Sequence, residues 1–264
     1  MTIVIGVKCE DGVVIGADST ATLGGGLFEK TVEQHEQPKI EIIPIHPIIV
    51  AYSGFVGLGQ RILLSLNCEW DRILTSDKLT ARSIIREAIL RVIERDIQIA
   101  NLTKQLFGQS AIESAICHTL ISLPLCGETV LLEYDPTTAS EEKTISLPFV
   151  SIGSGLKEAD VFLAFLKEYL WNNKSPSNLA DAKRAIIWAI SHVKKVHPGG
   201  GIGGDIQVAQ LTKDQSGNFK AEFENLMNIE MHLDYIESCK AVLQDYFLDK
   251  PKGNNEINEK KKNH

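Results

Sequence analysis

Strand-like and helix-like segments come in groups along this chain of 264 residues, and the grouping limits the folds that it can adopt. β-Branched runs with hairpin turn signals cluster at the beginning, in the middle and towards the end. Between these clusters lie stretches with apolar residues at three- and four-residue spacing, each long enough for two helices. The strict alternation of strand and helix that is typical of a doubly wound sheet is not seen. The order predicts an α+β protein, a four-layer αββα sandwich of two sheets, each covered by a helix pair.

The predicted elements follow from these patterns. The predicted strands are 3–9, 13–18, 39–43, 47–54, 114–123, 128–134, 205–212 and 219–224. The predicted helices lie within 55–106 and at 156–171, 178–196 and 229–247. A glycine-rich loop (23–27) and a polar stretch up to Pro38 are expected after the second strand. Residues 2–250 are predicted to form a single domain, followed by a disordered, charged tail over 251–264.

The charge and cysteine content argue against several classes of function and location. The formal net charge is −7, whereas a nucleic-acid-binding surface needs basic side chains that replace the counterions of phosphates. Five cysteines are scattered without CxxC spacing, which favours free thiols in a reducing compartment over disulfides or a zinc site. The amino terminus does not resemble a signal peptide, and no apolar run reaches the ~18 residues of a membrane span. We therefore expect a cytoplasmic protein that binds neither nucleic acid nor membrane.

Three patterns are similar to motifs of other chemistry, but the sequence around each pattern does not fit the motif. GGGIGG (199–204) matches GxGxxG, but it follows a predicted helix and precedes a predicted strand, the reverse of a dinucleotide-binding fold. The seven histidines stand singly, without the spacing of metal ligands. SIGSG (151–155) lacks the context of a GxSxG nucleophile elbow. We expect neither a metal ion nor an organic cofactor.

The amino terminus offers a candidate site, because the first predicted strand begins directly behind Met1 and Thr2. Initiator methionine is usually removed before a small residue, which would leave Thr2 with a free α-amine. That amine, with a pKa near ~8, could take the proton of the Thr2 hydroxyl, so that one residue carries both nucleophile and base. Many chains begin with Met-Thr, however, and the run is also compatible with an ordinary early strand. The residues alone leave both interpretations open.

Several segments resemble, in the same order, the landmarks of one enzyme family. TIVIGVKCEDGVVIGADSTATLG (2–24) resembles the start of mature proteasome β-type subunits and of the peptidase subunit of the bacterial HslV-type protease. The other similar segments are PKIEII (38–43), Ser53-Gly54 after a strand, GSG (153–155) before a helix and GGDIQVAQL (203–211). The segments after residues 60 and 215 are longer than this pattern requires, which favours a divergent bacterial branch such as the Anbu-type relatives. The resemblance implies the αββα fold of amino-terminal nucleophile (Ntn) hydrolases.

The resemblance implies roles for residues near the amino terminus. Thr2 would be the nucleophile, with its own α-amine as the base. Lys39 would lie near the Thr2 hydroxyl and lower the pKa of the amine through its positive charge. Asp18 would neutralise and orient that lysine. Because the interval between Asp18 and Lys39 is longer than usual in the family, Lys30 is the rival assignment.

The resemblance also implies how a substrate would be held. The backbone N–H of Gly54 would face the developing oxyanion, with Ser53 beside it in the substrate-binding region. Thr22 would help to align a bound peptide as an added strand. Ser154 would form a hydrogen bond near the Thr2 amine.

One departure from the family pattern concerns the surroundings of Ser154. The family often places an Asp and a Ser just before the final Gly-Gly, where this chain has Gly199 and Ile202. Asp205 is close in sequence but follows the glycines. We therefore expect the network around Ser154 to be incomplete or filled by a different group, which affects catalysis more than the fold.

These features predict an amino-terminal threonine peptidase that hydrolyses peptides or unfolded proteins through an acyl-enzyme ester. The resemblance implies a homo-oligomer, a ring or a related assembly with enclosed active sites, and it allows an ATP-dependent unfoldase as a partner. Two alternatives stay open. The chain could be an Ntn amidase or acylase for small amides, or a structural subunit without a working nucleophile.

Overall fold

The computed structural model describes residues 1–25, 28–34, 36–43, 45–108, 116–135, 139–171, 178–197 and 201–248. The chain divides into two compact units, Met1–Asn225 and Leu226–His264. In the second unit the described residues form helix α6 (Leu226–Leu248), and the predicted tail over 251–264 lies outside the described residues. The single domain expected over 2–250 stays a prediction. All of the predicted site residues belong to the first unit.

The β-branched runs at the start of the chain form the centre of a five-stranded antiparallel sheet with the order β10-β1-β2-β11-β12. The turn between the first two strands is closed by a hydrogen bond from the Cys9 N–H to the Gly12 carbonyl, at 2.9 Å. The strands are β1 (Val4–Lys8), β2 (Gly12–Ala17), β10 (Phe149–Ile152), β11 (Gln207–Lys213) and β12 (Phe219–Phe223). This sheet therefore joins segments from the beginning, the middle and the end of the first unit.

The second large sheet is also antiparallel and has the order β5-β6-β7-β8-β9. Its strands are β5 (Ile40–Ile42), β6 (Ile49–Gly54), β7 (Cys117–Leu125), β8 (Glu128–Tyr134) and β9 (Ser140–Lys143). Side chains alternate along β6, as the period of two in a strand requires. Ile49 and Ala51 face the first sheet, whereas Val50 and Tyr52 face the covering helices.

The segment that was expected to be a loop and a polar stretch contains two strands instead. β3 (Ala21–Gly25) pairs with β4 (Phe28–Gln34) in a separate two-stranded sheet. The register shifts between Leu23 and Gly25, which marks an irregularity in the pairing. The prediction for 23–38 is therefore wrong for most of that range, because glycine-rich and polar residues can still form a ladder when a partner strand is next to them.

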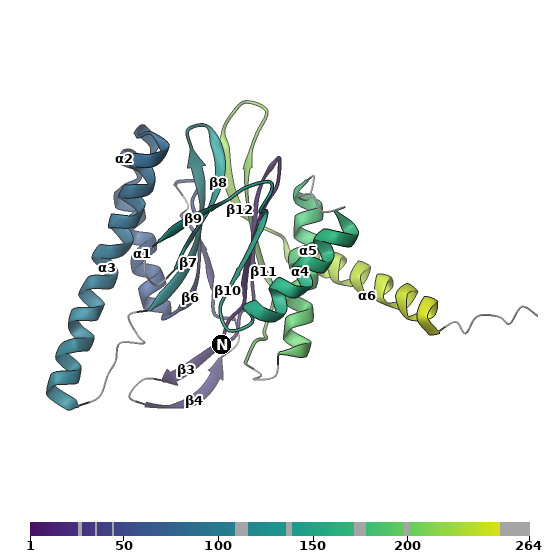
Figure 1. Ribbon diagram of the computed structural model, residues 1–264, viewed down its shortest axis with the longest axis horizontal. Helices are drawn as coiled ribbons and strands as arrows, with labels where there is room; N and C mark the ends of the chain where they lie inside the picture. The colour runs from purple at the N-terminus through teal and green to yellow at the C-terminus, as the bar shows by residue number, and fades with distance from the viewer. Residues whose placement is uncertain are drawn as a thin grey trace, which may run out of the picture. The chain divides into compact units, whose positions relative to one another are not determined.

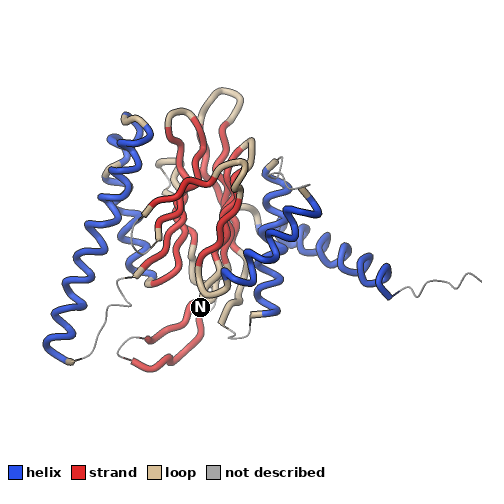
Figure 2. The backbone as a smooth tube through the Cα atoms, viewed as in Figure 1, coloured by secondary structure: helices blue, strands red, loops and turns tan. Residues whose placement is uncertain are grey.

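Helices cover the outer faces of both large sheets (Figures 1 and 2). The helices α1 (Val56–Cys68), α2 (Trp70–Thr75) and α3 (Lys78–Phe107) lie over the sheet that contains β6. The helices α4 (Leu156–Leu170) and α5 (Leu179–Val196) lie over the sheet that contains β1. The predicted αββα sandwich is confirmed. None of the described helices has an apolar stretch long enough to cross a membrane.

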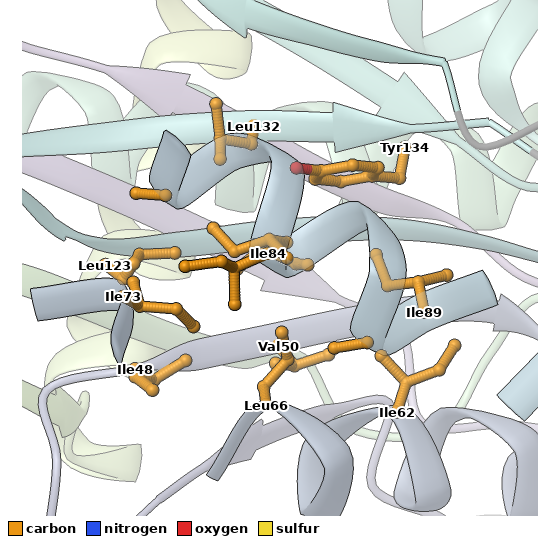
Figure 3. Packing of buried hydrophobic residues seen from close by; sticks show 14 of the residues in the cluster. Ile48, Val50, Ile62, Leu66, Ile73, Ile84, Ile89, Leu123, Leu132 and Tyr134 are labelled. Carbon is orange, nitrogen blue, oxygen red and sulfur yellow. The ribbon is translucent and has the colours of Figure 1, made fainter. Parts of the chain in front are cut away.

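Apolar side chains fill the spaces between the layers. One cluster lies between the two sheets and includes Val13, Ile15, Leu120 and Leu131. A second cluster lies between the β6 sheet and helices α1 to α3, where the labelled side chains of Figure 3 meet across the strands and helices. On the other side, α5 approaches β2 so closely that a Cβ on Gly16 would collide with Ile186. Each large sheet is thus packed on both of its faces, which fixes the positions of its strands.

Candidate active site

The first residues of the chain continue the pairing of β1 with β2. The Ile3 N–H donates to Asp18 Oδ1 at 2.9 Å, and the Asp18 N–H donates to the Ile3 carbonyl at 3.2 Å. Thr2 therefore lies just before β1, beside the residue that follows β2. Figure 1 marks this amino terminus at one end of the two large sheets.

The loop after β10 holds the backbone of Thr2. The Gly155 N–H donates to the Thr2 carbonyl at 3.2 Å, and the Thr2 N–H donates to Ser154 Oγ at 3.1 Å. Ser154 Oγ also lies 3.4 Å from the Thr2 carbonyl oxygen. Gly153 has a φ of +101°, and a Cβ at this position would collide with the same carbonyl, so only glycine permits the approach. The nitrogen and the carbonyl of Thr2 are both fixed by this loop.

Asp18 is completely buried and accepts hydrogen bonds from four groups. Three of them are backbone N–H groups, those of Ile3 (2.9 Å), Thr20 (3.3 Å) and Gly203 (3.2 Å). The fourth is the ammonium of Lys39, whose Nζ lies 2.6 Å from Asp18 Oδ1. These donors compensate a carboxylate charge that would otherwise be costly to bury.

Lys39 brings a second buried charge to this place, because only 5% of its side chain is exposed. Its Nζ lies 3.3 Å from the Met1 carbonyl oxygen, which belongs to the peptide bond of the Thr2 nitrogen. Burial lowers the pKa of the Lys39 ammonium, and the neighbouring Asp18 opposes this shift. The Lys39 backbone N–H donates to Gln207 Oε1 at 3.0 Å. The ion pair thus lies beside the bond between Met1 and Thr2.

Ser53, the last residue but one of β6, borders the same loop, and Gly54 follows it. A Cβ on Gly153 would lie 3.2 Å from Ser53 Oγ, so the Ser53 hydroxyl is next to the loop that holds Thr2. Gly54 has a φ of +137°, and a Cβ there would lie 2.5 Å from the Ile116 carbonyl oxygen. The last position of β6 therefore accepts only glycine. Because glycine has no side chain, the backbone N–H of this residue is not covered by one.

This arrangement contains groups that nucleophilic chemistry can use. It combines a residue with a hydroxyl group, a buried ammonium–carboxylate pair and a strand end with a bare backbone. In the part of the chain that the structure describes, no group of three or more His, Cys, Asp or Glu side chains could hold a metal ion.

A comparison with protein families shows to which family the chain belongs. The model described as "Proteasome subunit" matches residues 2–209. The chain belongs to the proteasome subunit family. The family that the sequence landmarks predicted is confirmed. No curated protein sequence gives a significant match to this proteasome subunit.

Solved structures of Anbu proteins share the fold of this proteasome subunit. Anbu (ancestral beta-subunit) from Yersinia bercovieri is 15% identical, with a TM-score of 0.67, and the match covers 94% of this chain and 98% of that chain. The Anbu complex of Pseudomonas aeruginosa, solved as a helical assembly, is 15% identical, with a TM-score of 0.67 and coverage of 95% and 98%. A Gly-1 mutant of Anbu from Hyphomicrobium sp. strain MC1 is 13% identical, with a TM-score of 0.66 and coverage of 96% and 99%. The longer segments noted in the sequence are thus accommodated in an Anbu-like fold.

Most of the residues that the family resemblance singled out lie together in this subunit. The structure brings together Thr2, Asp18, Lys39, Ser53, Gly54 and Ser154. Asp18 pairs with Lys39, whereas the side chain of the rival Lys30 lies outside what the structure describes. The side chain of Thr22 also lies outside the described part, so its role stays a prediction.

An apolar side chain lies where the family often has a polar one. Ile202 is buried, and its Cδ1 would be 2.8 Å from a Cβ on Gly155, beside the loop that holds the amino terminus. Asp205 is exposed, and Gly199 lies outside the described residues. Among the residues that the structure describes, Ser154 Oγ bonds only to the amino-terminal backbone.

Two residues that take part in the site were not predicted from the sequence. The Gly203 N–H donates to Asp18, and the Gln207 side chain accepts from the Lys39 backbone. The segment 203–211 was recognised as a family landmark, but no hydrogen-bonding role was assigned to Gly203 or Gln207. The position of the glycines directly before β11, where Gln207 pairs with Ala17 at the end of β2, is the signal that could have found both residues.

Proposed function

We propose that this proteasome subunit is a threonine-type peptidase whose nucleophile is Thr2, exposed by removal of Met1. The observation that carries the proposal is the buried Lys39 ammonium, 2.6 Å from Asp18 and 3.3 Å from the Met1 carbonyl that precedes the Thr2 nitrogen. A buried ion pair seldom makes a protein more stable than well-packed apolar side chains at the same place. Ionisable groups with perturbed pKa values, in contrast, are common at functional sites. The same position would let the Lys39 charge act on the Thr2 amine.

Removal of Met1 would turn the Thr2 nitrogen from an amide into an amine with a lone pair. The usual pKa of an α-amine is about 8, and a neighbouring ammonium lowers it, so the free base is abundant at neutral pH. Ser154 Oγ, which accepts the Thr2 N–H at 3.1 Å, would continue to accept an N–H from the amine. The lone pair then remains available for the hydroxyl proton of the same residue.

The reaction would proceed through two tetrahedral intermediates. The amine takes the proton from Thr2 Oγ1 while the oxygen forms a bond to the carbonyl carbon of the substrate peptide, and the carbonyl becomes an oxyanion. The Gly54 N–H donates to that oxyanion. The intermediate collapses, the C–N bond breaks, and the leaving amine receives the proton from the Thr2 ammonium. Water then attacks the ester by the same route and regenerates the Thr2 hydroxyl.

Peptides and unfolded proteins are the proposed substrates. Ser53 borders the nucleophile, and β3, which carries Thr22, would align an extended peptide as an added strand. Because an Anbu complex with this fold has been solved as a helical assembly, we also propose that this chain forms a homo-oligomer. An ATP-dependent unfoldase as partner and a cytoplasmic location stay predictions.

The intact mass of the purified protein, before and after a peptide epoxyketone, tests the mechanism. This reagent closes a ring only with an amine and a hydroxyl on the same residue. We expect loss of the Met1 mass and one adduct per chain. Thr2→Ser, which keeps both groups, should retain the adduct, and Thr2→Ala, which keeps only the amine, should lose it together with peptide hydrolysis.

Each contrary result has a definite meaning. An adduct in Thr2→Ala, or an unchanged hydrolysis rate, would exclude Thr2 as the nucleophile. Removal of Met1 with no adduct, together with rapid hydrolysis of small amides, would favour the acylase alternative. A retained Met1 would block the amine and favour a structural subunit.

A further inference from the structure

A groove between α1 and α3 lies apart from the residues around Thr2 and has a volume of about 380 Å³. Its size falls in the range of sites for small molecules. Arg61 of α1 and Arg91 and Arg95 of α3 line it, together with Glu69. The spacing explains the gathering, because side chains three or four residues apart share one face of a helix.

Two of the three guanidinium groups are held in place by carboxylates. Arg91 pairs with Glu69, whose other oxygen accepts from Arg72 at 2.6 Å, and Arg61 pairs with Asp96. The hydrogen bond from Arg91 lowers the pKa of Glu69, so this carboxylate is ionised at neutral pH. A guanidinium group has five N–H donors, so each arginine keeps donors beyond those already used.

The lining of the groove carries an excess of positive charge. Three arginines stand against one glutamate, and Arg72 and Asp96 cancel each other in this balance. Arg95 has no ion-pair partner within the described ranges of the chain. This local excess contrasts with the formal net charge of −7 for the whole chain.

We propose that this groove binds the phosphoryl group of a small molecule. The planar forks of guanidinium groups match the oxygens of a phosphate, and arginines already fixed by carboxylates lose little side-chain freedom on binding. An excess of two positive charges suits a phosphate dianion. The apolar side chains of Leu64 and Val92, which also line the groove, can contact an organic part of the ligand. The site does not depend on the proposed peptidase activity.

A cysteine in the groove provides a direct reporter. Cys68 lines the groove and is exposed, Cys126 and Cys239 are the other exposed thiols, and Cys9 and Cys117 are buried. The test uses the full chain with Cys126→Ser and Cys239→Ser, and it measures the rate at which iodoacetamide alkylates Cys68. We expect pyrophosphate and adenosine triphosphate, each without metal, to slow the reaction at low salt and less so at high salt.

The two anions distinguish the sources of the phosphoryl group. Equal protection means that the phosphoryl group alone is recognised, and tighter binding of the nucleotide means that the apolar wall takes part. No protection by either anion at millimolar concentrations would overturn the proposal.

A matched pair of variants locates the binding. Arg95→Gln removes a guanidinium group that has no described ion pair, so the fold is retained, and circular dichroism checks this. It should weaken protection by roughly 10- to 100-fold, the usual effect of a lost hydrogen bond to a charged group. Arg86→Gln makes the same change on the exposed side of α3 outside the groove lining and should leave protection nearly unchanged. Equal effects of the two variants would place the anion elsewhere and refute the site.

Discussion

Asp18→Asn is expected to destabilise the subunit more than Lys39→Met. Asp18 is fully buried and accepts from three backbone N–H groups and from the Lys39 ammonium. Asparagine removes the charge and replaces one acceptor oxygen with an NH2 group, which would point at donors. Lys39, with 5% of its side chain exposed, would be left with an uncompensated charge.

The structure sets the relative magnitudes. Breaking a buried pair so that a charge stays unpaired costs about 3–5 kcal/mol of unfolding free energy. In Lys39→Met the remaining Asp18 carboxylate keeps its three N–H donors, so the loss should be nearer the ~1–3 kcal/mol of an imperfectly satisfied polar group. The double variant leaves no charge unpaired, so its cost should fall below the sum of the single costs by about 1–3 kcal/mol.

Urea unfolding at pH 7, followed by circular dichroism, gives the three differences in unfolding free energy. Thermal unfolding should agree, with a midpoint shift of about 2–4 °C for each kcal/mol in a protein of this size. The stability of Asp18→Asn should also recover as the pH rises, because Lys39, whose pKa burial already lowers, then loses its proton. Additive single effects, or a larger loss in Lys39→Met than in Asp18→Asn, would refute the account of this ion pair.

Two further predictions concern the backbone and the pH dependence. Gly153→Ala should cost about 2–4 kcal/mol in urea unfolding, because its Cβ meets a backbone carbonyl at positive φ, whereas Gly127→Ala, at a φ of +82° in open space, should cost only about 1 kcal/mol. Equal losses would contradict the steric argument. Burial, with help from Glu133, raises the pKa of Asp160 above its usual 3.8, so the stability that this carboxyl contributes is present at lower pH and is lost as the pH rises through the raised pKa. Asp160→Asn should therefore gain stability relative to the parent as the pH rises from the usual 3.8 through the raised pKa, and a difference that does not change with pH would exclude this contribution.

The layered fold could be predicted because its elements carry strong local patterns. The β-branched runs and the helical periodicity predicted most strands of the two large sheets and both helix groups. They also predicted α6 within three residues, at 229–247. β9 was not predicted because its sequence, SEEK, has no apolar residue. It is a strand only because β8 lies beside it, where Leu131 pairs with Lys143. The pair β3–β4 was missed because its glycine-rich and polar sequence carries no clear strand pattern, and the two strands form by pairing with each other.

The site could be predicted only through the family resemblance. The hydrogen bond between Thr2 and Ser154 joins residues 152 positions apart, and no local pattern carries such a contact. The choice between Lys39 and Lys30 also depended on which lysine reaches Asp18 in space. The burial of Ile202 beside the loop could not be foreseen, since the residue stands in a glycine-rich run whose path depends on its neighbours.

Strand β6 has a consequence for how this chain can change in length. Its side chains pack alternately into two different cores, and its last residue, Gly54, must stand where a side chain does not fit. Deleting one residue from Ile49–Gly54 would exchange the two faces and move the glycine away from the site. Related sequences can therefore exchange residues of similar character before Gly54 but cannot change the number of residues in this strand, whereas the turn between β11 and β12 can change in length. Insertions and deletions should thus map the boundary between the parts of the chain that set the geometry of the site and those that do not.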